Sequence, residues 1–221
     1  RGPDPRSIWV TTSDGFYELT DKESKFYQKG AQLPFDPRKA AAAQFVEVDG
    51  ALWFLFALTV TDNRLSIFRD GQLKTSSVSI KTPKFFASDH EKNIWLGDFY
   101  DGLRKVSIES IRHDDLLHLK VEHFTSANGL VSNNLSTMLV DRDDNRWIGT
   151  DKGLQLLIDQ PLVTVYSNNS GLPAQNIYSV VQDKAGAIWF GAWDNYLVKY
   201  SNGVFTSEQK LWVQALFVDR D

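Results

Sequence analysis

An internal repeat is the feature of this sequence that most constrains its fold. Residues 129–157 recur 42 positions later as residues 171–200. The identical pairs at this offset are Gly129 and Gly171, Leu130 and Leu172, Asn134 and Asn176, Asp141 and Asp183, Trp147 and Trp189, and Gly149 and Gly191. Self-similarity at a period of this length is typical of architectures that stack one structural unit several times.

Weaker copies of the pattern lie earlier in the chain. Residues 85–106 keep Asp89, Trp95 and Gly97 in the same relation to one another. The tryptophans of the five copies stand at positions 9, 53, 95, 147 and 189, which gives steps of 44, 42, 52 and 42. The long step contains the charged stretch 107–122, which we interpret as an enlarged loop between two strands.

Each copy reads as four short strands. In the last copy they are NIYSVVQD, GAIWFGAW, YLVKYS and GVFTSEQ, runs rich in β-branched and aromatic residues. Asn202-Gly203 and Asp70-Gly71 predict hairpins between third and fourth strands, because both central positions of a type I′ turn need a positive φ. No segment has an apolar period of helical length. Four antiparallel strands repeated radially predict an all-β fold, a β-propeller of four-stranded blades.

An aspartate stands six residues before the tryptophan in the clearest copies. At the turn between the first and second strands, such a carboxylate can accept backbone N–H bonds. We expect Gly186, Asn93 and Asn145 to supply the positive φ that closes this turn. The tryptophan then fills the wedge between neighbouring blades, so its expected role is structural. The residues given this role are Asp89, Trp95, Asp141, Trp147, Asp183 and Trp189.

The two ends of the sequence suggest how such a ring would close. Residues 1–221 are expected to form one domain, with blades centred on Trp9, Trp53, Trp95, Trp147 and Trp189. The chain begins at a second strand, and residues 211–219 match a first strand. This segment would complete the first blade and close a ring of five. The alternative is a cut from a seven-bladed or larger array.

The motif GL-x3-N, followed by Asp, Trp-Ile-Gly-Thr and Gly-Leu, resembles the two-component regulator propeller repeat. The likeness is best in residues 129–157 and 171–200 and recognisable in 85–106, under half of the chain. In that family such repeats form the extracytoplasmic sensor region of hybrid histidine kinases and of some diguanylate cyclases. The resemblance implies a periplasmic or extracellular location, a sensed ligand and neighbouring domains of a longer signalling protein as partners.

The loops between second and third strands differ most among the copies. Residues 150–153 form a plain turn, whereas 98–102 and 192–195 carry aromatic and acidic residues. Aromatic rings beside carboxylates suit a sugar or a cationic ligand. We therefore predict a small-molecule or oligosaccharide site here; alternatively the rings pack on adjacent loops or on a next domain. The candidate ligand-binding residues are Asp98, Phe99, Tyr100, Asp101, Trp193 and Asp194.

Other kinds of site find little support in the sequence. There is no cysteine, so disulfides, thiolate zinc sites and cysteine nucleophiles are excluded. The net charge is −4, and acidic and basic residues are interspersed along the chain, so we expect no nucleic-acid partner. No apolar stretch of membrane-spanning length occurs, so no direct membrane insertion is expected. His113, His118 and His123 lie in the enlarged loop, where the alternatives are a metal site and a solvated loop; we favour the solvated loop and predict neither a metal nor a cofactor. Without a catalytic motif we expect a binding module; the alternatives are a propeller enzyme of lyase or glycosidase type and a protein-docking scaffold.

Overall fold

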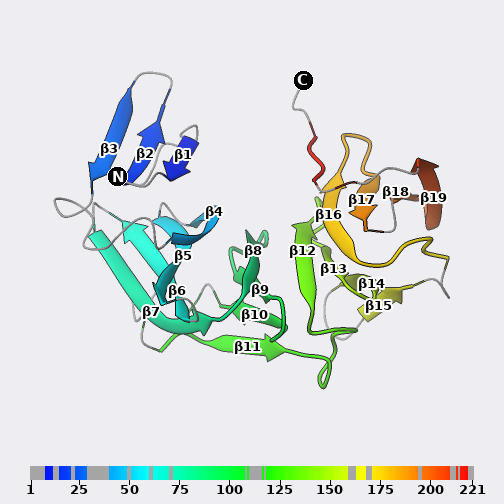
Figure 1. The fold of residues 1–221 in the computed structure, drawn as a ribbon, viewed down its shortest axis with the longest axis horizontal. Coiled ribbons are helices and arrows are strands. Elements are labelled where there is room, and N and C mark those ends of the chain that lie inside the picture. The colour runs from blue at the N-terminus through cyan, green and yellow to red at the C-terminus, as the bar shows by residue number, and fades with distance from the viewer. Residues whose placement is uncertain are drawn as a thin grey trace. The chain divides into compact units, whose positions relative to one another are not determined.

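The structure is a computed structural model of the chain. It describes residues 8–11, 15–20, 23–28, 40–48, 51–59, 62–69, 72–107, 109, 116, 118–158, 163–167, 171–193, 196–209, 213 and 215–218. Over these residues the chain is built from short strands that form separate sheets (Figure 1). Within the described ranges, no helix is both long enough and apolar enough to span a membrane.

The strands follow one another in sheet after sheet. The first sheet holds β1 (Ile8–Thr11), β2 (Gly15–Leu19) and β3 (Ser24–Gln28), and the second holds β4 (Ala40–Val48), β5 (Ala51–Thr59), β6 (Asp62–Arg69) and β7 (Gln72–Ile80). The third holds β8 (Pro83–Ser88), β9 (Ile94–Asp98), β10 (Leu103–Val106) and β11 (Val121–Phe124). The fourth holds β12 (Leu135–Val140), β13 (Arg146–Thr150), β14 (Gly153–Leu157) and β15 (Val163–Tyr166). The fifth holds β16 (Ile177–Gln182), β17 (Ile188–Ala192), β18 (Tyr196–Ser201) and β19 (Val204–Gln209).

This order confirms the predicted β-propeller fold with four-stranded antiparallel blades. Within each sheet, strands that are neighbours in sequence are hydrogen-bonded neighbours in space. Each repeat tryptophan falls in the strand that the pattern assigns to it, as Trp53 in β5, Trp147 in β13 and Trp189 in β17 show. Closure of the ring at five blades is not tested by this order and stays a prediction.

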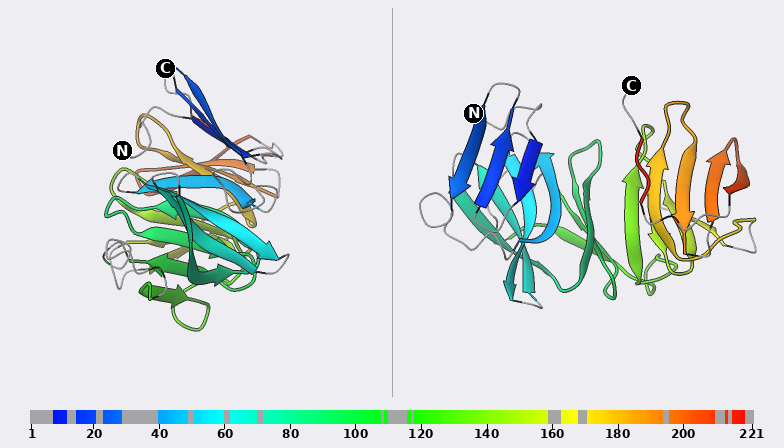
Figure 2. Two further views of the ribbon diagram at one scale, coloured as in Figure 1. Left: turned by 90° about the vertical axis from the view of Figure 1, so that its left-hand side faces the viewer. Right: turned by 45° about the horizontal axis from the view of Figure 1, so that its top comes forward.

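The chain divides into two compact units. Unit one comprises residues 1–94 and 106–121, and unit two comprises residues 95–105 and 122–221, so the boundary runs through the third sheet. In unit two the first strands of successive blades, β12 and β16, lie side by side (Figures 1 and 2). In unit one, β4 and β8 are neighbours in the same way.

An apolar core fills the space between the fourth and fifth sheets in unit two. Trp147 is 3% exposed and packs among side chains of both sheets. The other buried members are Leu154, Leu156, Leu172, Ala174, Ile177, Val180, Ile188, Phe190, Ala192 and Val198. The predicted wedge role is confirmed for Trp147, and Trp53 and Trp95 are likewise buried. Trp189 is only half-buried, with the Lys199 ammonium 5.1 Å from its ring.

The aspartate turn forms as predicted, with one correction. The Oδ1 atom of Asp141 accepts the backbone N–H groups of Asp143 and Asn145, each at 2.9 Å. The positive φ lies one position earlier than expected in two copies, at Lys92 (71°) and Asp144 (62°). The expectation for Asn93 and Asn145 was therefore wrong, because these residues donate backbone and side-chain N–H groups to the aspartate instead. Gly186, with φ of 90°, was assigned correctly.

The hairpin between β18 and β19 has the predicted turn. Asn202 and Gly203 both have positive φ, 50° and 80°, and the flanking Ser201 and Val204 pair directly. Asp70 and Gly71 lie outside the described residues. β10 ends at Val106 and β11 begins at Val121, so the enlarged loop predicted at 107–122 lies between two strands, except that residues 121 and 122 belong to β11.

The predicted closing strand, 211–219, is described at Val213 and residues 215–218. None of these five residues is in a strand. Val213 lies against Gly191, and the Leu216 N–H donates to the Ser179 hydroxyl at 2.9 Å. In the same way Ile177 lies against Gly149, one repeat earlier. The segment thus packs on the fifth sheet as the first strand of the fifth sheet packs on the fourth, while its pairing with the first sheet stays a prediction.

Candidate functional site

In unit two, the loops between second and third strands contact the segments that lead into first strands. The Asp151 N–H donates to the Asn134 carbonyl at 3.4 Å, and one repeat later the Trp193 N–H donates to the Asn176 carbonyl at 3.1 Å. The Gly102 N–H donates to the Asn133 carbonyl at 3.2 Å. These bonds bring the variable loops and the connecting segments to the same end of the sheets.

The loop after β9 presents Tyr100 to solvent. Asp98 is 0% exposed, and its Oδ1 accepts the N–H groups of Tyr100 at 2.8 Å and Asp101 at 3.1 Å. A Cβ at Gly102, whose φ is 77°, would collide with the Phe124 carbonyl, so the turn needs glycine. Tyr100 is 67% exposed, and its ring stands edge-on to half-buried Phe99 at 4.6 Å.

Asp98 therefore differs from the prediction. It was proposed to face a ligand, but its buried carboxylate organises the loop that carries Tyr100. The sequence could not show this burial, because an aspartate at the start of a turn has the same sequence pattern whether its carboxylate accepts backbone N–H groups or faces solvent.

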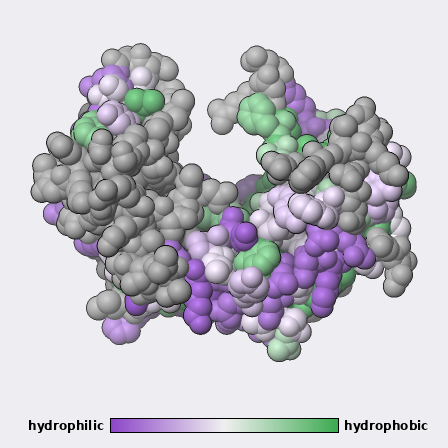
Figure 3. All heavy atoms as spheres, in the orientation of Figure 1, coloured by the Kyte–Doolittle hydropathy of each residue, from purple (hydrophilic) through white to green (hydrophobic). Residues whose placement is uncertain are grey.

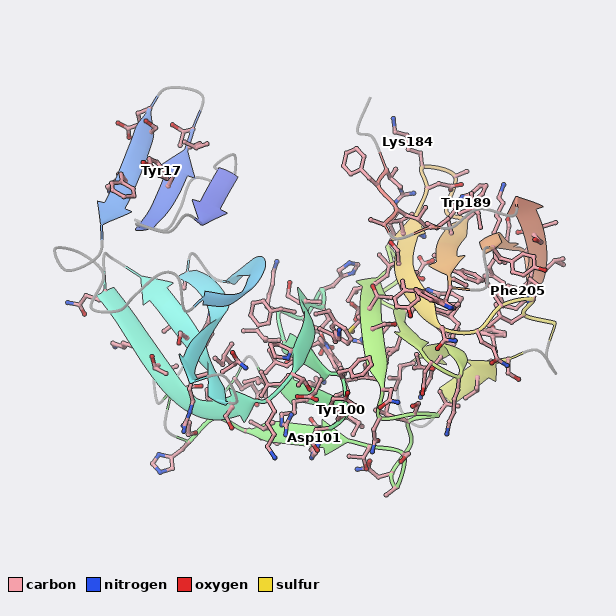
Figure 4. The ribbon with its side chains drawn as sticks, viewed as in Figure 1. Tyr17, Tyr100, Asp101, Lys184, Trp189 and Phe205 are labelled. Carbon is pink, nitrogen blue, oxygen red and sulfur yellow. The ribbon has the colours of Figure 1, made fainter. Side chains whose placement is uncertain are left out.

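Asp101 takes part in a small charged network beside Tyr100. Its Oδ2 lies 2.5 Å from the Arg104 guanidinium, and its carbonyl accepts a hydrogen bond from the His123 ring Nε2 at 2.6 Å. The carboxylate is still 44% exposed. Figure 4 shows Tyr100 and Asp101 together, well apart from Lys184 and Trp189. This network fixes the loop against β11 and leaves part of the Asp101 carboxylate open.

Trp193 pairs with a second exposed aromatic residue that the sequence analysis did not select. Its ring lies 5.9 Å from that of Tyr178 at an interplanar angle of 56°. Trp193 is 53% exposed and Tyr178 is 43% exposed. Figure 3 shows mainly hydrophilic residues over the visible described part of unit two, with small separate hydrophobic areas. Two exposed rings in contact are unusual on such a surface.

A comparison across the repeat explains both residues. One period earlier, Asp151 occupies the place of Trp193, and its Oδ2 accepts the Asn134 side-chain N–H at 2.9 Å. Ser136 occupies the place of Tyr178, and its hydroxyl donates to the Gly149 carbonyl at 3.0 Å. The fifth blade thus replaces two inward-bonded polar side chains with exposed rings. This 42-residue comparison is the signal that could have found Tyr178.

Two of the candidate residues, Asp194 and His113, lie outside the described residues. His118 is exposed. Among the residues described, no group of three or more His, Asp or Glu side chains is arranged to hold a metal ion.

Asp183 and Tyr166 have shifted pKa values, and both residues have a structural role in unit two. The Trp189 indole N–H, donated to Asp183 at 2.7 Å, holds the pKa of that carboxyl below its ordinary value. Burial, together with a hydrogen bond to Tyr200, raises the pKa of Tyr166 to about 12. Asp183 caps a turn, and Tyr166 packs against the core of unit two.

The family model described as "Two component regulator propeller" matches residues 171–194. This part of the chain is thus similar to a two component regulator propeller repeat. The matched range contains Tyr178 and Trp193, so both exposed rings stand within the regulator propeller repeat itself. This match confirms the resemblance that the sequence motif indicated.

Solved structures share the fold at low sequence identity. The extracellular domain of a hybrid two component system from B. thetaiotaomicron is 18% identical with a TM-score of 0.69, over 94% of this chain and 27% of that one. Virginiamycin B lyase from Staphylococcus aureus is 10% identical with a TM-score of 0.69, over 99% of this chain and 73% of that one. This chain thus spans about a quarter of the length of that extracellular domain. Comparison with curated proteins gave no match.

Proposed function

We propose that this chain is a non-catalytic, ligand-binding propeller that forms part of the extracytoplasmic sensor region of a bacterial signalling protein. The regulator propeller repeat at residues 171–194 supports the signalling context. The likeness to extracellular domains of two hybrid two component systems from B. thetaiotaomicron supports a location outside the cytoplasm. The partners are then a small-molecule or oligosaccharide ligand and the neighbouring domains of the longer protein.

The exposed ring pair of Tyr178 and Trp193 is the observation that carries the ligand proposal. Leaving about half of each large ring in water forgoes the stabilisation that burial would give. A ligand with an apolar face, such as the C–H face of a sugar ring, would cover these rings. The ordered backbone beneath them, fixed by the bond from Trp193 to Asn176, keeps the rings in place before binding.

Tyr100 and the open part of the Asp101 carboxylate offer a second contact region at the same end of the sheets. Tyrosine supplies an apolar ring and a hydroxyl, and the carboxylate accepts hydrogen bonds from hydroxyl groups. An oligosaccharide has several rings and many hydroxyl groups. We therefore favour an oligosaccharide over a single small sugar.

A propeller enzyme is the second candidate. The observation in its favour is the fold similarity to virginiamycin B lyase, which extends over 99% of this chain. An enzyme would convert the compound that it binds. Product formation detected by mass spectrometry after prolonged incubation with a bound compound would therefore favour the enzyme over the sensor.

The proposal is tested by thermal denaturation with a panel of oligosaccharides. A ligand that binds only the folded chain must raise the melting temperature. Trp193→Ala and Tyr178→Ala should each weaken the affinity for a stabilising sugar by about tenfold or more, because truncated aromatic hot spots cost about 2 kcal/mol. Phe217→Ala is the matched control, since Phe217 is 85% exposed but lies on the C-terminal segment.

Two results would count against the proposal. One is a panel in which no sugar raises the melting temperature. The other is a sugar whose affinity survives both aromatic substitutions but falls with Phe217→Ala.

A further inference from the structure

Two Asn-Gly pairs occur in the sequence, Asn128-Gly129 and Asn202-Gly203. Both asparagines and both glycines are exposed, and neither glycine has a neighbouring atom within 4 Å of its Cβ position. Glycine has no side chain to hinder its backbone nitrogen, so this nitrogen can approach the side-chain carbonyl carbon of the preceding asparagine. The two pairs therefore have the same residue types and are both exposed to solvent.

The two asparagine side chains differ in how they are held. The Asn128 Oδ1 accepts the Thr125 N–H at 2.5 Å and the Thr125 hydroxyl at 3.1 Å. Its Nδ2 donates to the His123 carbonyl at 2.8 Å, so both ends of the carboxamide are fixed. Within the part of the chain that the structure describes, no hydrogen bond holds the Asn202 side chain.

We propose that Asn202 is a site of spontaneous deamidation and isoaspartate formation, and that Asn128 is protected from the same reaction. The Gly203 backbone nitrogen loses its proton and attacks the Asn202 side-chain carbonyl carbon. The new N–C bond closes a five-membered succinimide ring, while the bond to the amide nitrogen breaks and ammonia leaves. Water then adds to one of the two ring carbonyl carbons, and the ring opens to aspartate or isoaspartate.

Isoaspartate at this position disturbs the fifth blade. It adds a methylene group to the main chain of a two-residue turn that joins β18 to β19. Phe205 is the second residue of β19, and its ring lies 4.7 Å from Tyr200 and 5.0 Å from Tyr166 (Figure 4 labels Phe205). A shift of β19 therefore pulls Phe205 away from the aromatic cluster at the edge of the core.

Peptide mapping by mass spectrometry tests the proposal on the full chain. The chain is incubated at mildly alkaline pH, both folded and in concentrated urea, and each Asn-Gly peptide is followed over time. In the folded chain Asn202 should deamidate at least about tenfold faster than Asn128, because rotating the Asn128 carboxamide breaks several hydrogen bonds. In urea the two rates should become similar. Enzymatic methylation of isoaspartate would identify the product.

Asn202→Gly is the matched control, because a Gly-Gly turn has the same geometry and no side-chain amide. After incubation the parent chain should show a lowered melting temperature, and the Asn202→Gly chain should not. The proposal fails if Asn128 reacts as fast as Asn202 in the folded chain. It also fails if Asn202 remains an amide there while both sites react in urea.

Discussion

At the scale of single residues, the aspartate and tryptophan of the repeat form one unit. Asp141 accepts two backbone N–H groups with Oδ1, while its Oδ2 accepts the Trp147 indole N–H at 2.8 Å. A tryptophan that fills the wedge between sheets buries its N–H group, and a buried donor without an acceptor is costly. The six-residue interval places the carboxylate where it satisfies turn and indole together.

Asp141→Ala should therefore destabilise the chain by about 3 kcal/mol, because it leaves the buried indole and the turn N–H groups without their acceptor. Asp143→Ala is the control, since Asp143 is an exposed neighbour in the same turn and should change stability by about 0.5 kcal/mol or less. Urea denaturation of both variants measures the difference. Equal midpoints for the two variants would show that the carboxylate is not the centre of the turn.

The lowered pKa of Asp183 predicts a pH dependence of stability. The Trp189 indole N–H lowers this pKa most, and the Ala187 backbone N–H adds to the effect. A carboxyl whose pKa is lower in the folded state stabilises it at pH values above its unfolded pKa, near 3.8. This stabilisation is lost as the pH falls through the folded pKa.

The stability advantage of the parent chain over Asp183→Asn should thus be full near neutral pH. It should shrink once the pH falls below about 4. Urea midpoints of both chains over an acid pH series provide the measurement. An advantage that grows on acidification would contradict the assigned role of the indole bond.

At the scale of elements, a glycine two residues after the tryptophan lets the next first strand approach. A Cβ at Gly149 would stand 2.6 Å from the Thr137 methyl and 2.9 Å from the Ile177 carbonyl oxygen. Gly191 plays the same part for the C-terminal segment, where a Cβ would stand 2.6 Å from the Val213 Cβ. The Trp-x-Gly motif thus combines a wedge with a gap for the neighbouring strand.

Gly191→Ala should push Val213 away and loosen the C-terminal segment. The added methyl group overfills this contact, and such overpacking costs about 1 to 3 kcal/mol. Hydrogen exchange at the Leu216 amide, which donates to Ser179, should become faster. Adding Val213→Gly should restore slow exchange, because glycine lacks both the Cβ and the methyl group that the alanine side chain at position 191 would meet. Slow exchange in the single variant would mean that the segment does not rest on Gly191.

The elements themselves were largely predictable from the repeat. Strand alternation and the Asn202-Gly203 pair located the strands and the turn of the last blade. The φ values at Lys92 and Asp144 were not predictable by residue type, since neither lysine nor aspartate favours the left-handed region as glycine does. The turn imposes these positive φ values because the asparagine that follows donates its backbone N–H to the aspartate at the start of the turn.

At the scale of the whole molecule, the fold could be predicted because each copy of the repeat has the sequence pattern of the same four-stranded blade. The candidate site was only partly predictable, since it depends on where a blade departs from the pattern. Tyr100 and Trp193 were found as loop aromatics. Tyr178 was missed because it lies inside a strand, where a tyrosine usually packs against a neighbour. Asp98 was assigned to a ligand because its burial cannot be seen from a loop sequence.

The central claim is that a ligand binds at the end of the sheets that carries Tyr178, Trp193 and Tyr100. Hydrogen exchange, measured with and without the sugar that stabilises the chain most, tests this claim directly. We predict slower exchange in the segments around residues 98–102, 175–178 and 192–193. Slower exchange confined to the turns at the opposite end of the fifth blade, residues 183–187 and 202–203, would contradict it.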